Sequence, residues 1–465
     1  MNKSIASLVV AAVVLIPSPS ALAQNWVATG NGGDWGNSAN WDSGVPDSAG
    51  DTANLSFDLT TTTQPNGYNV NLEGNTYTLG TLNLGTTTSG FFYLNNGTLN
   101  FDNNGNGAVL NDVATAAGEQ LNNLVINLSD NLTINDNQNN TASTPYGFEF
   151  GYGVGTSVTG TGNLTINNNN PVGNSTGNGP IGVFGSVDNV GEIILDGTGT
   201  GTVQFFDSIG SNVTEIDQDS LSSSTSLNNG ISGTSIIKIS AGTLGFGGGS
   251  GFNNPTQVIV GDTATDGANS VLDIHGTSGW TMGSTQTLSG FGTVYTAYGD
   301  QALTTVAGSM ISPGSVGHIG KLTVTANLTL ADNTGLTFIL GASGSNSSIE
   351  VDRTLTLPSL QLNLTLLDNA GADSLGSLGD GTYELISYQA LSGVASTGDI
   401  SSLFNITAPG GYTYALSDTS VTGPGQIDLT VSGGSEAIPE PGTWALLFGG
   451  FSMLGLLLKQ RHRQV

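Results

Sequence analysis

The sequence predicts an all-β fold, a solenoid of parallel strands, from three observations. Apolar and polar residues alternate in short segments, for example at 77–84, 97–101 and 124–128, and such alternation is typical of half-buried strands. The segments recur at uneven spacings, commonly ~15–30 residues, which suits the coils of a solenoid with variable loops. No convincing amphipathic helix interrupts them.

The expected strands follow one another along the body. The segment 131–135 (Asn-Leu-Thr-Ile-Asn) returns nearly unchanged at 163–167, and further strands are expected at 192–195, 202–206, 235–239, 257–260, 271–274 and 322–330. Asn flanks many of them because it tolerates left-handed geometry and hydrogen-bonds its own turn. Stacked Asn side chains can also form ladders. The Asn- and Gly-rich composition therefore indicates turns between strands rather than binding.

We expect five segments in the chain. These are a signal peptide at 1–24, a Trp-rich N-terminal cap at 25–75, a β-solenoid at 76–345, a C-terminal β-module at 346–434, and a sorting segment at 435–465 with an apolar helix at 444–458. The terminal module contains regular alternation at 349–351, 355–357, 360–367, 383–388, 412–416 and 426–431. A solenoid needs such a module because its last coil would otherwise expose the core.

The N-terminal segment has the pattern of a secretory signal peptide. Lys3 precedes an apolar stretch at 5–16, and Ala21 and Ala23 form the small-residue cleavage site, so the mature chain is expected to begin at Gln24 or Asn25. The chain contains no cysteine. An exported protein of this composition has no disulfide framework, and burial and hydrogen bonding must stabilise it.

The C-terminal segment also has the pattern of a targeting signal. Pro439, Glu440 and Pro441 precede an apolar run at 444–458, slightly shorter than the ~17–25 residues of an ordinary membrane-spanning helix. The basic residues Lys459, Arg461 and Arg463 follow it. Cationic residues after an apolar run stay on the cytoplasmic side. We therefore expect the body outside and the C-terminus inside.

This segment closely resembles the PEP-CTERM sorting signal of Gram-negative bacteria. The resemblance covers residues 438–465 and implies recognition by an exosortase, removal of the tail near Pro439–Pro441, and transfer to the cell surface or the extracellular polysaccharide. The general secretion machinery and the inner membrane would then be earlier partners. The alternative is a plain tail anchor with a chance Pro-Glu-Pro.

A second resemblance concerns the body. Its start contains Trp26, Gly33-Asp34-Trp35, Asn40-Trp41, Gly44-Val45-Pro46, Gly50-Asp51-Thr52-Ala53 and Phe57. Together with the segments 288–294, 311–324 and 327–330, it looks like proteins with autotransporter-associated β-strand repeats. This resemblance implies a secreted, non-catalytic, right-handed parallel β-helix. Because the chain carries a sorting tail, export by a separate route is implied.

The charge of the body excludes several partners. Without residues 1–24 and 438–465, 34 acids face only Lys238, Lys321 and Arg353, a net charge of about −31. Such a surface repels nucleic acid and anionic lipid. It also repels acidic polysaccharide unless a divalent cation bridges the two. We expect no nucleic-acid partner.

The body offers little sign of catalysis, and no catalytic residue is assigned. Its two histidines, His275 and His318, lie apart in the sequence, and the glycine-rich stretch 245–251 lacks the Lys-Ser/Thr of a phosphate loop. A polysaccharide lyase or hydrolase is the alternative, since such enzymes use paired carboxylates or a base with cationic groups. The few basic residues are scattered, and the sequence does not identify which acids approach one another.

Two further groups are candidate binding residues. Asp102, Asn104 and Asn106 match the first half of a Ca²⁺ loop, but its twelfth position is Val113 instead of Glu, so a polar turn is the simpler interpretation and no cofactor is expected.

Trp26, Trp35 and Trp41 are candidate carbohydrate contacts, since aromatic rings stack on sugars. They are equally suited to plug the open end of a solenoid, which is the interpretation we favour. The expected function is that of an exported structural or adhesive protein. A Ca²⁺-stiffened adhesin is a weaker third hypothesis.

Overall fold

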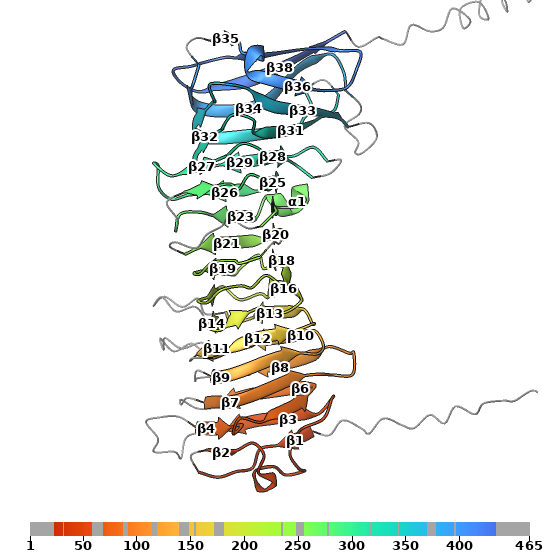
Figure 1. Cartoon of the computed structure of the whole chain (residues 1–465), viewed down its shortest axis with the longest axis vertical. Helices are drawn as coiled ribbons and strands as arrows, with labels where there is room; N and C mark the ends of the chain where they lie inside the picture. Colours follow the sequence, from red (N-terminus) through yellow and green to blue (C-terminus); the bar gives the residue numbers. More distant parts are fainter. Residues whose placement is uncertain are drawn as a thin grey trace, which may run out of the picture. The chain divides into compact units, whose positions relative to one another are not determined.

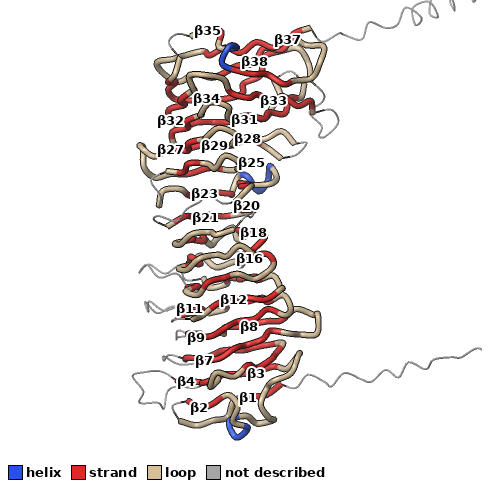
Figure 2. Tube along the Cα trace, in the orientation of Figure 1, coloured by secondary structure: helices blue, strands red, loops and turns tan. Residues whose placement is uncertain are grey.

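The computed structural model describes residues 23–30, 32–57, 68–86, 92–113, 119–138, 148–152, 155–171, 181–233, 236–247, 255–276, 279–315, 318–342, 344–369, 378–394 and 397–433. Contacts divide the chain into two compact units. The first contains residues 1–214 and 222–225, and the second contains 215–221 and 226–465. Each unit is nearly all β (Figure 2).

In the first unit, successive strands alternate between two parallel sheets (Figure 1). Sheet 1 has the order β1 (Ala23–Asn25), β3 (Thr52–Phe57), β6 (Thr81–Thr86), β8 (Ala108–Asp112), β10 (Leu132–Asp136), β13 (Leu164–Asn168) and β16 (Gly191–Asp196). Sheet 2 contains β2 (Gly32–Asp34), β4 (Tyr68–Asn71), β5 (Thr76–Leu79), β7 (Phe92–Phe101), β9 (Glu119–Leu128), β11 (Phe148–Tyr152), β12 (Ser157–Gly160), β14 (Ile181–Val183), β15 (Ser186–Val187) and β17 (Thr202–Phe205). A short 3-10 turn, η1 (Ser38–Asn40), lies between β2 and β3.

The second unit repeats this alternation. The division between the units falls within β18 (Val213–Gln218) and β19 (Ser224–Leu227). Sheet 1 then contains β20 (Ile236–Ile239), β22 (Gln257–Val260), β25 (Thr287–Gly290), β28 (Met310–Pro313), β31 (Gly335–Leu340), β33 (Leu362–Asp368) and β36 (Phe404–Thr407). Sheet 2 contains β21 (Gly242–Phe246), β23 (Ser270–Asp273), β24 (Trp280–Thr281), β26 (Thr293–Tyr295), β27 (Ala302–Thr304), β29 (Lys321–Val324), β30 (Asn327–Thr329), β32 (Ser348–Thr356) and β34 (Gly381–Ser392).

Strand pairing becomes antiparallel near the end of the second unit. There β34 pairs with β38 (Gly425–Ser432), β38 with β37 (Thr413–Asp418), and β37 with β35 (Gly398–Asp399). A one-turn 3-10 segment, η3 (Ser401–Leu403), precedes β36. The antiparallel strands cover the last parallel edge of sheet 2, where unpaired backbone groups would otherwise be exposed.

The alternation of apolar residues explains the core. The two near-copies of the sequence lie side by side, because Leu132 pairs with Leu164 and Ile134 with Ile166 in register. Ile134 and Ile166 are each 1% exposed. Each such side chain stabilises the fold by roughly 1.5–3 kcal/mol. The expected β-helix-like, all-β fold is therefore confirmed in its coarse form, parallel strands stacked coil on coil.

An asparagine ladder runs across sheet 1 of the first unit. Its members are Asn25, Asn54, Asn83, Asn111, Asn135 and Asn167. Each Nδ2 donates to the Oδ1 of the preceding member at 2.7–2.9 Å, and the partners lie 24–32 residues apart in the chain. The ladder confirms that part of the Asn content serves stacking.

Other Asn residues turn the chain inside strands. Asn96 in β7 and Asn123 in β9 have φ of 60° and 48°, and they occupy the same position in adjacent coils, because Asn95 pairs with Asn122 and Gly97 with Leu124. Asn adopts this left-handed conformation at lower cost than most residues. Both strands bend there while their ladder continues on either side.

Several details differ from the expectation. The predicted strand 77–84 is divided at Gly80, where the chain passes from β5 to β6, and the predicted strand 322–330 is divided into β29 and β30. A single helical turn, α1 (Ala264–Gly267), and several strands, among them β8, β18, β21, β31 and β36, were not predicted. No helix within the described part of the chain is long and apolar enough to cross a membrane. The predicted helix at 444–458 lies outside that part.

Candidate functional site

The three N-terminal tryptophans pack together in the interior. Trp26, Trp35 and Trp41 are 6%, 0% and 4% exposed. The rings of Trp26 and Trp41 meet edge to face at 5.0 Å, and those of Trp35 and Trp41 at 4.8 Å. Such pairs contribute about 0.5–1.5 kcal/mol beyond their buried area. The cluster fills the start of the first unit, as a plug would.

The indole nitrogens also have partners inside the protein. Nε1 of Trp26 donates to the Tyr68 hydroxyl at 2.8 Å, that of Trp35 to the carbonyl of Pro46 at 3.2 Å, and that of Trp41 to the carbonyl of Trp35 at 2.7 Å. A sugar needs an exposed ring face, and these rings offer at most a few per cent of their surface. The geometry favours the cap role over carbohydrate contact.

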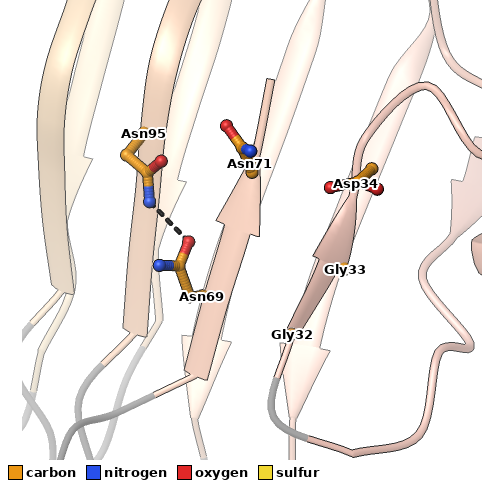
Figure 3. A pocket seen from close by; sticks show the side chains of 6 residues that line it. All are labelled: Gly32, Gly33, Asp34, Asn69, Asn71 and Asn95. Carbon is orange, nitrogen blue, oxygen red and sulfur yellow. Dashed lines mark hydrogen bonds between the residues drawn. The ribbon is translucent and has the colours of Figure 1, made fainter. Parts of the chain in front are cut away.

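A shallow depression of about 360 Å³ lies on sheet 2 of the first unit (Figure 3). It is lined by Gly32, Gly33, Asp34, Asn69, Asn71 and Asn95. Gly32 has φ 138°, and a Cβ there would lie 1.9 Å from the Asn69 carbonyl, so only glycine fits. Asn95 donates to Asn69 across the strands. The depression carries a single carboxylate, whereas glycosidases need two.

The candidate Ca²⁺ loop is occupied by an acid from the next coil. Oδ2 of Asp130 accepts hydrogen bonds from the backbone N–H of Asn103 at 2.6 Å and of Gly105 at 2.9 Å. Asp102 accepts from the backbone N–H of Asn104 at 3.0 Å, and the Asn106 side chain donates to the carbonyl of Asn103. The loop directs N–H groups inward, and these bind an anion rather than a cation.

Sequence analysis missed a buried pair of carboxyl groups. Asp112 and Asp136 pair in register on β8 and β10, and both are 0% exposed. Gln138 donates to Asp112 at 2.7 Å, and its backbone N–H donates to Asp136 at 3.0 Å. Burial, and secondly the Asp112 carboxyl, raises the pKa of Asp136 well above its ordinary value. A polysaccharide has no access to this pair.

The histidines and basic residues lie at separate places. Nδ1 of His275 lies 2.7 Å from the Asp273 carboxylate, and His318 is exposed in a turn where its backbone pairs with Ser315. Lys238, Lys321 and Arg353 lie on β20, β29 and β32. Among the described residues, no group of three or more His, Cys, Asp or Glu could hold a metal ion.

The predicted processing signals lie at either side of the described strands in the sequence. β1 begins at Ala23, and β38 ends at Ser432. Ala21, Pro439, Glu440, Pro441, Lys459, Arg461 and Arg463 lie outside the described residues. Gln24, the first residue expected after cleavage, is 3% exposed and pairs with Ala53.

The comparisons with known proteins add no family. No protein-family model matches the chain, and no curated protein matches it significantly.

Proposed function

We propose that this chain is an exported, non-catalytic structural or adhesive protein, a right-handed parallel β-helix delivered to the cell surface or extracellular polysaccharide matrix by an exosortase. The observation that carries the proposal is the order Pro439-Glu440-Pro441, apolar run and basic end. The alternative, a plain membrane anchor, shares the apolar run but has no need of the Pro-Glu-Pro.

The position of the strands supports this proposal. All described strands lie between Ala23 and Ser432, so cleavage after Ala23 and near Pro441 would leave the two sheets almost intact. Cleavage after Ala23 would remove only the pair that Ala23 forms with Thr52. A body that keeps its hydrogen-bond ladders after both cuts is suited to release from the membrane.

The surface supports a structural role over polysaccharide cleavage. A second depression, of about 390 Å³ on the second unit, is lined by Glu350 and by neutral groups such as Ser387, Tyr388 and Gln426. Like the depression beside Asp34, it carries one carboxylate, and the stacked pair Asp112–Asp136 is buried. General acid and base catalysis needs two groups that reach the substrate.

The test is localisation and intact mass in the native host. We compare the wild type with Glu440→Ala, and with Glu436→Ala as a matched control in the preceding linker. We expect the wild type and the control to lose the tail near Pro441 and reach the surface or matrix, and Glu440→Ala to stay uncut in the inner membrane. If the wild type also stays full-length in the membrane, the tail is a plain anchor.

A further inference from the structure

The three basic side chains of the body differ in their partners. Lys238 lies 3.2 and 3.3 Å from two aspartates, and Lys321 pairs with Glu350. Arg353 has no carboxylate partner within the described residues. Its Nε donates to the carbonyl of Thr325 at 2.9 Å, and its two terminal nitrogens make no hydrogen bond there. In so acidic a chain, an arginine without an acid needs an explanation.

The free end of Arg353 lies beside the backbone that follows an exposed tyrosine, Tyr298. A Cβ on Gly299 would lie 2.8 Å from its Nη1, so the guanidinium covers the backbone that directly follows Tyr298. Tyr298 is 57% exposed and Tyr295 is 40% exposed. Neither hydroxyl makes a hydrogen bond within the described part of the chain, whereas the hydroxyl of buried Tyr383 contacts two backbone carbonyls.

His275 completes the group. Its ring centroid lies 6.3 Å from that of Tyr298, and its side chain is 49% exposed. Nδ1 is held by Asp273, which pairs in register with Tyr295. This hydrogen bond orients the ring and leaves Nε2 for a ligand. His275, Tyr298 and the end of Arg353 therefore lie next to one another, and exposed Tyr295 lies beside Asp273 on the neighbouring strand. These four side chains are here called the Tyr–Arg surface.

We propose that the Tyr–Arg surface binds a polysaccharide of mostly neutral sugars that carries sparse carboxylate groups. Tyrosine rings pack against the apolar faces of sugars while their hydroxyls remain available for hydrogen bonds. The terminal nitrogens of an arginine match the two oxygens of a carboxylate.

The charge of the protein selects among anionic polymers. A body with a net charge of about −31 repels a polymer that bears an acid on every sugar. A polymer with few carboxylates is repelled less, and these carboxylates can bind at Arg353. This inference rests on the proposed function only in taking the matrix polysaccharide as the partner, since the patch itself is read from the geometry.

The test is native affinity electrophoresis of the full-length protein. The gels contain xanthan, a glucan with side chains that carry glucuronate, neutral hydroxyethylcellulose, or polygalacturonate, which is charged on every sugar. We expect the strongest retardation in xanthan and the weakest in polygalacturonate. Arg353→Gln should weaken binding to xanthan about fivefold and leave binding to hydroxyethylcellulose unchanged. Tyr298→Ala should weaken binding to both.

The control is Lys321→Gln, which removes a basic residue that already has an acid partner, and it should bind like the wild type. Thermal unfolding of each variant checks that the fold is intact. The proposal is overturned if xanthan does not retard the wild type, or if Arg353→Gln and Tyr298→Ala bind like it. Sorting is measured separately. A wild type that binds xanthan but stays full-length in the membrane would overturn the sorting proposal alone, and a wild type that is released but not retarded by xanthan would overturn this proposal alone.

Discussion

Oδ1 of Asn167 is buried without a hydrogen-bond donor, and the residue beside it in register on β16 is Asp196. A carboxylate accepts hydrogen bonds but does not donate them. The asparagine ladder therefore ends at Asn167, because the Asp196 side chain has no donor for its Oδ1. At its other end, Nδ2 of Asn25 donates to the Asp42 carboxylate at 2.6 Å, and this hydrogen bond is the main reason that the pKa of Asp42 is lowered.

Extending the ladder should stabilise the protein. In Asp196→Asn, the new Nδ2 can donate to Asn167, and the new Oδ1 can keep the hydrogen bond from the backbone N–H of Gly197. We expect a gain of about 1 kcal/mol in the free energy of unfolding, measured by urea denaturation. Asp300→Asn is the control, because it makes the same change of charge at an exposed site outside the ladder. Equal stabilisation of both variants would assign the effect to net charge.

The buried carboxyl pair should make stability depend on pH. Asp136 has a raised pKa in the folded protein, so the folded state keeps a proton that the unfolded chain releases above about pH 3.9. This contribution to stability is complete below that pH and is lost as the pH rises through the raised folded value.

Asp136→Asn has no carboxyl group to ionise at this position, so the variant does not lose stability as the pH rises. Asn fits the position because its register partner on β13 is Asn168. We expect the variant to be more stable than the wild type at pH 7 by at least about 1 kcal/mol, with the difference vanishing below about pH 4. Thermal unfolding across this range is the measurement. A gain that is independent of pH would contradict the titration of Asp136.

The tryptophan cluster should be needed for stability. Trp41→Ala removes a ring that contacts two others. We expect the free energy of unfolding to fall by about 3–5 kcal/mol in the first unfolding transition. Trp41→Phe keeps most of the packing but loses the donor to the Trp35 carbonyl, so its loss should be smaller. A Trp41→Ala protein of normal stability that no longer binds polysaccharide would instead show that the rings face a ligand.

The loop at Asp102 should not depend on calcium. Asp130→Ala removes the acceptor for two backbone N–H groups, and we expect a loss of about 1–2 kcal/mol. Adding Ca²⁺ or a chelator should leave the melting temperature of the wild type unchanged. A rise with Ca²⁺ that Asp102→Ala abolishes would support the Ca²⁺-stiffened adhesin. Asn106→Ala is the matched control, because the side chain of Asn106 forms hydrogen bonds only within the loop.

The sequence alone determined the class of the fold, because alternation marks a strand whatever its neighbours are. It indicated the strands at 163–167 and 257–260, which the structure contains as β13 and β22. The two processing signals are also local patterns, and their assignment remains a prediction. The role of Asn in turns and ladders was likewise expected from its side chain.

Only the tertiary structure decided which residues meet. Asp112 and Asp136, the acid that fills the loop at Asp102, and the contact of Arg353 with Gly299 depend on register between coils of unequal length. Loop lengths set this register, and no local pattern encodes them. The burial of the tryptophans depended on the same packing, because an indole ring suits both a core and a sugar-binding face.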